Sequence, residues 1–362
     1  MTVFSLFAYL PLNGYIFRKN MTIQDIMPRR MQARELLGDY WLNGRAVSLA
    51  DLRGQVVLLD FWDFTSSASL RTLPYVLAWA ERYRVLGLTV IGVHVPRFAF
   101  GQDPERIARA LRRLGVGFPV VMDNSQLIWT QYSNRVWPTK HLIDVDGFIR
   151  CQSIGEGGYG PFERSLQHLL HEAHPLEDLP DLLEPLRETD RQDAVCYRAT
   201  PEILAGYLRG SIGNVEGCVP ESVIAYADPG IYIDGRIYVQ GAWRNERECI
   251  RWEGAPGEEG ALFVRYRGSE VNLVVDPGGT IPVDVRILQD GRPLTKENKG
   301  EDVRLTASGN SLVRLDGPRL YTIARNRQFG DYLLRLQPAS PGFALYSVTG
   351  VTAVIPELFG SN

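Results

Sequence analysis

The hydrophobic pattern of the chain changes near residue 175. Before that point, apolar runs of strand length alternate with segments of helical period; residues 56–62 (VVLLDFW) form a nearly continuous apolar run, and residues 104–114 place apolar side chains on one helical face. After it, short apolar runs are separated by Gly, Pro, Asp and Asn turns. The pattern predicts an α/β sandwich with a mixed central sheet, followed by an all-β antiparallel sandwich of jelly-roll type.

The same periodicities predict the elements of the first half. Strands are expected at 56–62, 88–93, 119–122, 139–143 and 148–153, and helices at 31–37, 69–84, 104–114 and 161–171. Pro74 should kink the second of these helices, because a proline inside a helix cannot donate its backbone hydrogen bond. Asn43-Gly44 favours a tight turn, so residues 40–47 are expected to form a small edge hairpin.

An acidic, proline-containing stretch at 175–193 marks the boundary between the two halves. We therefore divide the chain into an N-terminal extension (1–34), a first domain (35–175), a linker (176–200) and a second domain (201–362). The linker is poor in glycine and serine and contains Leu179, Leu182, Leu183 and Leu186. Buried leucines at this spacing would hold the linker on a surface, so we expect the two halves to form one rigid unit.

Charge and the N-terminal sequence exclude several classes of protein. The formal net charge is -3 and no dense Lys/Arg block occurs, which argues against nucleic acid as a partner. The opening segment MTVFSLFAYLPLNGYIFRKN has its positive charges after its apolar stretch, unlike an export signal, and it is too interrupted for a membrane span. A cytoplasmic protein without a membrane span is expected.

The cysteines and histidines predict neither a metal site nor a cofactor. Four cysteines occur without a CxxC motif or a ligand-like Cys/His pairing, as is typical of a reducing compartment. A disulfide between Cys218 and Cys249 is left open. The three histidines His168, His171 and His174 repeat every three residues, and we interpret them as a solvated helix face.

Residues 59–76, LDFWDFTSSASLRTLPYV, resemble the strand-turn-helix of the thioredoxin superfamily, in which DFW-x-x-x-C-x-x-C opens a proline-kinked helix. Further segments extend the resemblance over residues 35–175: SLADLRGQVVLLDFW, GLTVIGVHVPRFAF, WTQYSNRVWPTKHLIDVDGFIR and GEGGY. The first half is therefore similar to redoxins of the TlpA/AhpC-TSA type, especially the soluble part of DipZ-type proteins. Those relatives place this region outside the membrane, which is the alternative to a cytoplasmic location.

The resemblance places the two family cysteines at Ser66 and Ser69, within the sequence Ser66-Ser67-Ala68-Ser69. A hydroxyl has too high a pKa to ionise as a thiol does, and it forms no disulfide, so this turn should not perform thiol-disulfide exchange. We interpret Ser66 as the N-cap of the helix. Two alternatives stay open: the sequence is an inactive Cys-to-Ser form of an active enzyme, or exchange uses Cys151. Enzymatic activity is thus undecided.

The other site residues are also implied by the resemblance. Asp60 corresponds to the buried acid behind the second cysteine, and Pro138 to the cis-proline facing the turn, so a peptide or protein is the expected partner. A serine hydrolase built on Ser66, Asp60 and His94 is a minor alternative. The side chains expected to line the groove are Trp62, Phe64, Trp137 and Glu156.

The second half resembles the carbohydrate-binding-module-like sandwich that accompanies the redoxin domain in DipZ-type relatives. A glycan or protein ligand on this sandwich is therefore a further expectation. The acidic residues Asp276, Asp284 and Asp290 are interpreted as turn residues and not as a calcium cluster. Six aromatic residues are expected mainly in the core, with an exposed sugar-stacking platform as the alternative: Trp243, Trp252, Tyr266, Tyr321, Tyr332 and Tyr346.

Overall fold

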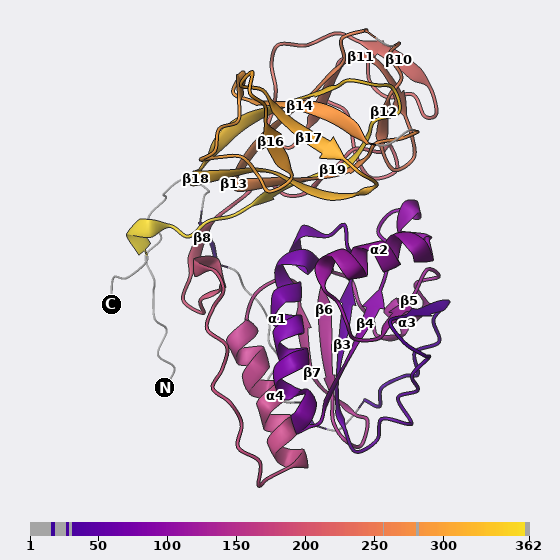
Figure 1. The fold of residues 1–362 in the computed structure, drawn as a ribbon, viewed down its shortest axis with the longest axis vertical. Coiled ribbons are helices and arrows are strands. Elements are labelled where there is room, and N and C mark those ends of the chain that lie inside the picture. Colours follow the sequence, from indigo (N-terminus) through magenta and orange to yellow (C-terminus); the bar gives the residue numbers. More distant parts are fainter. Residues whose placement is uncertain (1–15, 19–26, 29–30, 256, 280–281, 359–362) are drawn as a thin grey trace, which may run out of the picture.

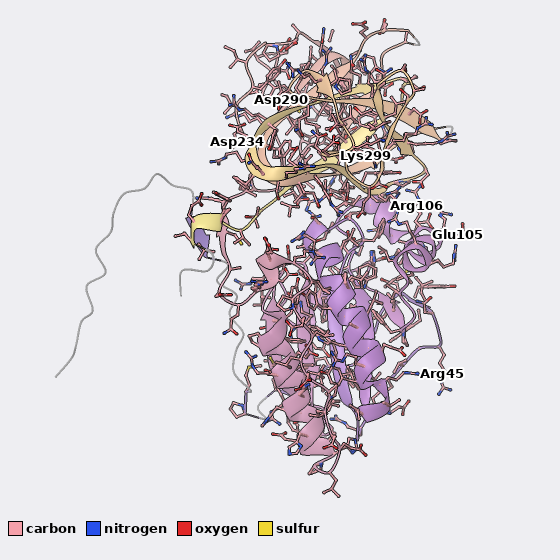
Figure 2. All side chains as sticks on the ribbon, turned by 60° about the vertical axis from the view of Figure 1, so that its left-hand side comes forward. Arg45, Glu105, Arg106, Asp234, Asp290 and Lys299 are labelled. Atoms are coloured by element: carbon pink, nitrogen blue, oxygen red, sulfur yellow. The ribbon has the colours of Figure 1, made fainter. Side chains whose placement is uncertain are left out.

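The computed structural model describes residues 16–18, 27–28, 31–255, 257–279 and 282–358. An α/β domain is followed along the chain by an all-β domain, and the two lie in contact (Figure 1). The fold class expected from the hydrophobic pattern is confirmed: a thioredoxin-like mixed sheet with helices, and then an antiparallel β domain. Figure 2 shows the same arrangement with side chains, with Arg106 at the boundary between the two domains.

The first domain, here called the thioredoxin-like domain, is built on a six-stranded sheet of order β2-β5-β4-β3-β6-β7. Strand β4 runs parallel to β3 and β5, and the other neighbours are antiparallel. All residues of β3 are buried, as a continuous apolar run predicts for a strand covered on both faces. The strands are β2 (Tyr40–Leu42), β3 (Val56–Trp62), β4 (Leu88–His94), β5 (Val120–Met122), β6 (Thr139–Ile143) and β7 (Ile149–Ile154).

Helices cover both faces of this sheet, because alternate residues of a strand point to opposite sides. Val56 and Leu58 of β3 pack against α1 and α4, and Trp62 packs against α2, whereas Leu59 faces α3 on the other side. The helices are α1 (Ser67–Tyr83), α2 (Pro104–Leu114), α3 (Leu127–Gln131) and α4 (Tyr159–Ala173). Short 3-10 turns lie at η1 (Arg84–Leu86), η2 (Ala99–Gln102), η3 (Glu188–Asp190) and η4 (Pro356–Leu358).

The second domain, here called the sheet domain, is an 11-stranded antiparallel sheet that encloses one core. Its main path is β10-β11-β12-β19-β13-β18-β14-β17-β16, with β15 beside β14 and β9 beside β19. The long strands β13 and β18 pair along most of their length. The strands are β9 (Ile203–Leu204), β10 (Val223–Tyr226), β11 (Ile237–Asn245), β12 (Ile250–Trp252), β13 (Ala261–Asp276), β14 (Val283–Gln289), β15 (Arg292–Pro293), β16 (Val303–Leu305), β17 (Ser311–Leu315), β18 (Arg319–Pro338) and β19 (Ala344–Val351).

The connection between the domains follows the surface of the thioredoxin-like domain along α1 and α4 (Figure 1). The Leu183 N–H donates to Glu163 Oε2 at 2.9 Å, and Leu179 and Leu183 pack against the core beneath them. Leu186 remains 56% exposed, although its N–H donates to the Tyr75 hydroxyl at 2.7 Å. Strand β8 (Val195–Tyr197) then pairs with β1 (Ile16–Arg18). The linker therefore lies on a surface through some of its predicted leucines.

Two local predictions were wrong, for the same physical reason. Residues 31–37 form no helix, because their backbone bonds to the β6–β7 region, including the Ile149 N–H to the Met31 carbonyl at 2.8 Å. Residues 40–47 form no hairpin, because β2 pairs with β5 instead. In both places backbone partners distant in the chain replace a local hydrogen-bonding pattern.

The secondary structure also contains elements that periodicity missed. Helix α3 and strands β10, β12, β16 and β17 are additions. The apolar run 231–238 also predicts a strand, but β11 begins only at Ile237. Most of the N-terminal extension lies outside the described residues. Across the part of the chain that is described, no helix has the length and apolar character needed to cross a membrane.

Candidate functional site

The turn between β3 and α1 uses its serine hydroxyls as structural hydrogen-bond acceptors. Ser66 is the N-cap of α1, with extended backbone, and its Oγ accepts from the Ser69 N–H at 3.2 Å. Ser69 Oγ in turn accepts from the Asp63 N–H at 3.4 Å. The exposed fractions of Ser66 and Ser69 are 5% and 2%. The N-cap interpretation of Ser66 is confirmed.

Asp63 is a site residue that the sequence reasoning missed. It is buried directly after β3, and its carboxylate accepts from the Thr65 N–H at 2.7 Å and the Arg97 N–H at 3.3 Å. Its Oδ2 also lies 3.2 Å from His94 Nε2. Burial alone would raise the pKa of Asp63, but the hydrogen bond and charge of His94, with Arg97 and Thr65, hold it below its ordinary value. The signal that could have identified Asp63 in the sequence was its position between two aromatic residues, in WDF.

The Asp63–His94 contact removes the geometric basis of a serine hydrolase. Within the described residues, no hydrogen bond joins Ser66 or Ser69 to His94. The imidazole is fully buried, Phe64 stacks on it with ring centroids 5.6 Å apart, and its Nδ1 has no hydrogen-bond partner. A serine nucleophile needs a base within hydrogen-bond reach. Asp60, the proposed acid of that triad, lies elsewhere and faces a lysine.

Asp60 and Lys140 are directly opposite each other on β3 and β6. Both are buried, and neither Asp60 Oδ1 nor Lys140 Nζ has a hydrogen-bond partner among the described residues. Burial raises the pKa of Asp60 to about 6, although the charge of Lys140 opposes the shift. Burial also lowers the pKa of Lys140, although the charges of Asp60 and Glu156 oppose this shift. The buried acid implied by the resemblance is thus present, with a lysine that the sequence reasoning did not pair with it.

The predicted groove residues occupy three different environments. The Trp137–Pro138 peptide bond is cis, and Trp137 stacks on Trp129 with ring centroids 4.3 Å apart. Trp62 and Phe64 are each 1% exposed, so neither ring is presented to solvent. The structure therefore does not bring these four residues together on one accessible surface. Glu156, described next, lies at a cavity beside the turn.

A cavity of about 370 Å³ lies between the turn and the sheet domain. Glu156 forms an ion pair with Arg71 of α1 at 2.8 Å. The remaining wall is mainly apolar and includes residues of both domains. The lining residues are Ser67, Ala68, Arg71, Glu156, Cys196, Tyr197, Arg198, Ala199, Pro201, Thr349, Gly350, Val351 and Thr352.

The sheet domain covers the turn directly. Asn272 of β13 donates from Nδ2 to Ser67 Oγ at 3.2 Å. Beside this contact, Phe98 and Leu70 of the thioredoxin-like domain join a hydrophobic cluster with Val274 and Tyr346 of the sheet domain. Phe98 and Tyr346 meet edge to face, with ring centroids 5.0 Å apart. The Ser66–Ser69 turn is therefore an inter-domain contact in this chain.

None of the four cysteines, all of which lie in the described residues, forms a disulfide. Cys151 is in the core beneath α1 and α4, with no exposed surface. Cys249 lies in the inter-domain cluster, where burial, followed by the nearby Glu246, raises the pKa of its thiol. Cys218 is exposed and not bonded to Cys249. Cys196 is the cysteine that lines the cavity beside the turn.

His168 and the three acidic residues singled out in the sheet domain each have a hydrogen-bond or ion-pair partner. His168 is half-exposed and pairs with Glu172 at 3.0 Å, and no cluster of metal-ligating side chains occurs among the described residues. Asp276 caps the Gly278 N–H, and Asp290 accepts from the Leu333 N–H, each at 2.9 Å. Asp284, within β14 and not in a turn, pairs with Arg304.

The aromatic residues of the sheet domain form core and not an exposed platform. Trp243, Trp252, Tyr266 and Tyr321 are at most 1% exposed. Tyr346 belongs to the inter-domain cluster, and Tyr332 packs against the core. Rings without exposed surface cannot stack on a ligand, so these six residues do not together form the sugar-stacking platform that was the alternative.

Comparisons with known proteins match both domains separately. Residues 32–152 match the AhpC/TSA family, and residues 200–349 match a family described as "Thioredoxin like C-terminal domain". Protein DipZ of Mycobacterium bovis is 33% identical over 262 residues, which is 70% of this chain and 36% of DipZ. Thiol-disulfide oxidoreductase ResA of Bacillus subtilis is 28% identical over 107 residues, covering 30% of this chain and 57% of ResA.

A solved structure is similar to part of the chain. A putative thiol:disulfide interchange protein DsbE from Chlorobium tepidum superposes with a TM-score of 0.35 and 22% identity, covering 40% of this chain and 99% of that one. The chain spans about a third of the length of DipZ, the relative that it matches across both domains. It joins a thioredoxin-like redoxin domain of the AhpC/TSA family to a thioredoxin-like C-terminal domain, and in this combination it is related to DipZ.

Proposed function

We propose that this chain is a redoxin-like binding protein that does not exchange thiols and disulfides, and that takes up a segment of a peptide or protein in the cavity beside the Ser66–Ser69 turn. The observation that carries the proposal is the use of both serine hydroxyls as buried structural acceptors. Exchange requires a thiolate that attacks a disulfide sulfur, and neither position supplies sulfur.

The cavity beside the turn supports binding. Its volume of about 370 Å³ lies within the usual range for small-molecule sites, and its mainly apolar wall carries one ion pair, Arg71–Glu156. Such a site suits an apolar side chain whose backbone or neighbouring residue bonds to the charged pair. The first domain, the linker and the sheet domain each contribute to the wall, so the ligand would contact both domains at once.

Exchange activity is tested with two disulfide substrates, insulin and the small hydroxyethyl disulfide, each with dithiothreitol as reductant. We expect the native chain to accelerate neither reaction. Ser66→Cys/Ser69→Cys should act at least on the small substrate, which does not require the sheet domain to leave the turn. Turnover by the native chain would refute the proposal, and its loss in Cys196→Ser or Cys151→Ser would identify the thiol responsible.

Binding is tested by selecting peptides from a displayed library on the full chain. Ala68→Trp would fill the cavity, whereas Ala50→Trp places the same ring at an exposed position away from it. We expect selected peptides to lose binding to the first variant and retain it with the second. Failure to select any peptide, or equal binding to both variants, would contradict the peptide site. Circular dichroism checks that both variants fold.

A further inference from the structure

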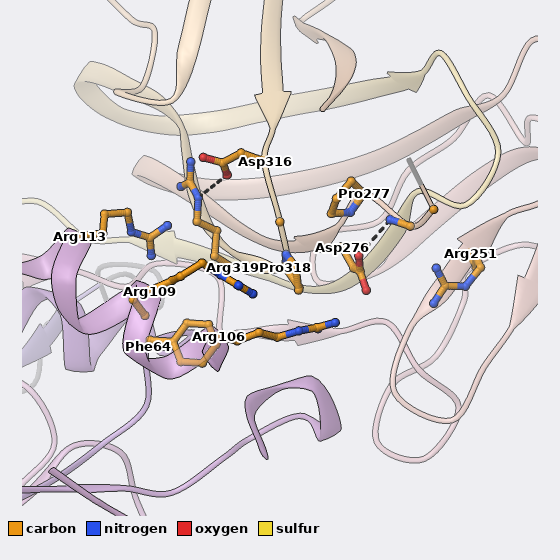
Figure 3. Close-up of a pocket in the computed structure, with 14 residues that line it drawn as sticks. Phe64, Arg106, Arg109, Arg113, Arg251, Asp276, Pro277, Asp316, Pro318 and Arg319 are labelled. Atoms are coloured by element: carbon orange, nitrogen blue, oxygen red, sulfur yellow. Dashed lines mark hydrogen bonds and ion pairs between the residues drawn. The ribbon is translucent and has the colours of Figure 1, made fainter. Parts of the chain in front are cut away.

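A second, larger cavity of about 690 Å³ lies between α2 and the loops at one end of the sheet domain (Figure 3). It shares no lining residue with the cavity beside Ser67. Phe64, Pro277 and Pro318 give it apolar walls, while five arginines from both domains line it: Arg106, Arg109, Arg113, Arg251 and Arg319. Only two carboxylates are among its lining residues, Asp276 and Asp316.

Three of these arginines form one stripe along α2. Arg106, Arg109 and Arg113 are three and four residues apart, so they share a helical face, and Figure 3 shows them beside the loops of the sheet domain. Like charges at this spacing repel each other along a helix. A negatively charged ligand would relieve that repulsion. Arg319 and Arg251 approach the same space from β18 and β12.

The five guanidinium groups differ in how closely they are already bonded to carboxylates of the protein. Arg319 bonds to Asp302 and Asp316, and Arg251 bonds to Glu246. The remaining pairs are weaker or absent. Arg106 lies 3.2 Å from Asp103, and Arg109 reaches only Glu105 at 4.0 Å.

Arg113 makes no hydrogen bond or ion pair with any described residue. Burial, followed by the positive charge of Arg319, lowers its pKa. The two lining carboxylates are already engaged, since Asp276 accepts from the Gly278 N–H and Asp316 from Arg319 and Tyr321. Arg109 and Arg113 therefore keep donors directed at the cavity.

We propose that this inter-domain cavity binds a small molecule carrying at least two anionic groups, phosphate or carboxylate. The planar guanidinium donates two parallel hydrogen bonds to either group, which a point charge does not. A cavity of about 690 Å³ admits a ligand of metabolite size. One anionic group binds between Arg109 and Arg113, and a second reaches Arg319 or Arg251 across the domain boundary.

Isothermal titration of the full chain tests the proposal with two probes, inorganic pyrophosphate and citrate, at low salt and at 150 mM salt. We expect saturable binding of one probe or both. Stronger binding of pyrophosphate would assign a phosphorylated ligand, and stronger binding of citrate a polycarboxylate. Absence of saturable binding with both probes would overturn the proposal.

Matched variants locate the site. Arg109→Gln/Arg113→Gln removes the two least satisfied guanidinium groups and should weaken binding at least tenfold. Arg112→Gln removes one exposed charge from the same helix at a position that does not line the cavity, and should change affinity less than twofold. Equal weakening by both changes would show general charge attraction and overturn the site. Thermal unfolding without ligand checks that both variants remain folded.

Discussion

Asn272 of β13 donates a hydrogen bond to Ser67 at the start of α1, across 3.2 Å in space and 205 residues in sequence. The contact places strand β13 of the sheet domain over the Ser66–Ser69 turn. Both side chains are buried, and the cluster containing Phe98 and Tyr346 lies beside them. Any partner of the turn must therefore bind together with the sheet domain or displace it.

Ser66→Ala should destabilise the thioredoxin-like domain by about 1 kcal/mol, because α1 loses the acceptor for the Ser69 N–H. Chemical denaturation followed by tryptophan fluorescence measures the change. Ser125→Ala is the control, since Ser125 is exposed and should stay within about 0.5 kcal/mol of the native chain. Equal stability of all three proteins would contradict a structural role for the Ser66 hydroxyl.

Asp63→Asn should cost about 1–3 kcal/mol at pH 7, because the buried acceptor of the Thr65 and Arg97 N–H groups loses its charge. The pKa of Asp63 is depressed in the folded chain, so its stabilisation is present above the ordinary value of 3.8 and is lost as pH falls through the folded pKa. The difference from the native chain should therefore shrink in acid. Denaturation from pH 7 to pH 3 measures it.

The control for Asp63 is the exposed Asp178, where Asp178→Asn should leave stability nearly unchanged over the same range. A cost for Asp63→Asn that stayed constant down to pH 3 would show that the carboxylate charge is not the source of the effect. In that case steric misfit of the amide would be the cause.

Lys140→Met should raise the pKa of Asp60 above about 6, since the lysine charge is what opposes the effect of burial. A raised folded pKa means that ionising Asp60 destabilises the fold, so stability falls as pH rises from 3.8 through about 6. In the variant that fall should extend to higher pH. Carbon-13 NMR of the Asp60 carboxyl gives the pKa, and an unchanged value would disprove the coupling.

Replacing both Asp60 and Lys140 tests whether this buried charged pair stabilises the fold. Asp60→Leu/Lys140→Met should equal the native chain in stability or exceed it by about 1–4 kcal/mol, because neither charge then has to be desolvated. Thermal unfolding at pH 7 measures this difference. A double variant less stable than the native chain would show that the pair stabilises the fold.

Leu183→Asp should speed proteolysis of the segment 176–200, because Leu183 packs on the core of the thioredoxin-like domain. Leu176 is 99% exposed, so Leu176→Asp is the control and should leave the rate unchanged. Mass spectrometry of a limited digest locates the cut sites. Rapid cleavage of the native segment into two separately soluble halves would refute the prediction of a rigid two-domain unit.

Periodicity predicted the central elements of the thioredoxin-like domain closely. Strand β3 and helix α2 have the predicted bounds. A strand buried on both faces is a continuous apolar run, and a helix buried on one face repeats its apolar residues with the helical period, so both can be recognised in the sequence. Segments whose backbone partners are distant were not predictable in this way. Residues 31–37 and 40–47 look locally like a helix and a hairpin, but they bond to β6–β7 and to β5. Pairing with a distant strand does not produce a recognisable pattern in the local sequence.

The candidate site was predictable only as far as one domain determines it. The N-cap was expected from a hydroxyl residue at the start of a helix, and the cis bond before Pro138 from the resemblance, and both are present. Asn272 over the turn and the arginines of β12 and β18 beside α2 were missed. Their positions depend on how the two domains dock, and docking leaves no periodic trace in either sequence.

Ser67 and Asn272 are far apart in the sequence, so their contact can form only after most of the chain has been synthesised. The thioredoxin-like sheet is complete at β7, more than a hundred residues before β13 leaves the ribosome. During that interval Leu70, Phe98 and Phe100, which later meet the sheet domain, remain without their cover. Chaperones that recognise apolar surface would therefore meet the nascent chain at the same patch that the finished protein hides.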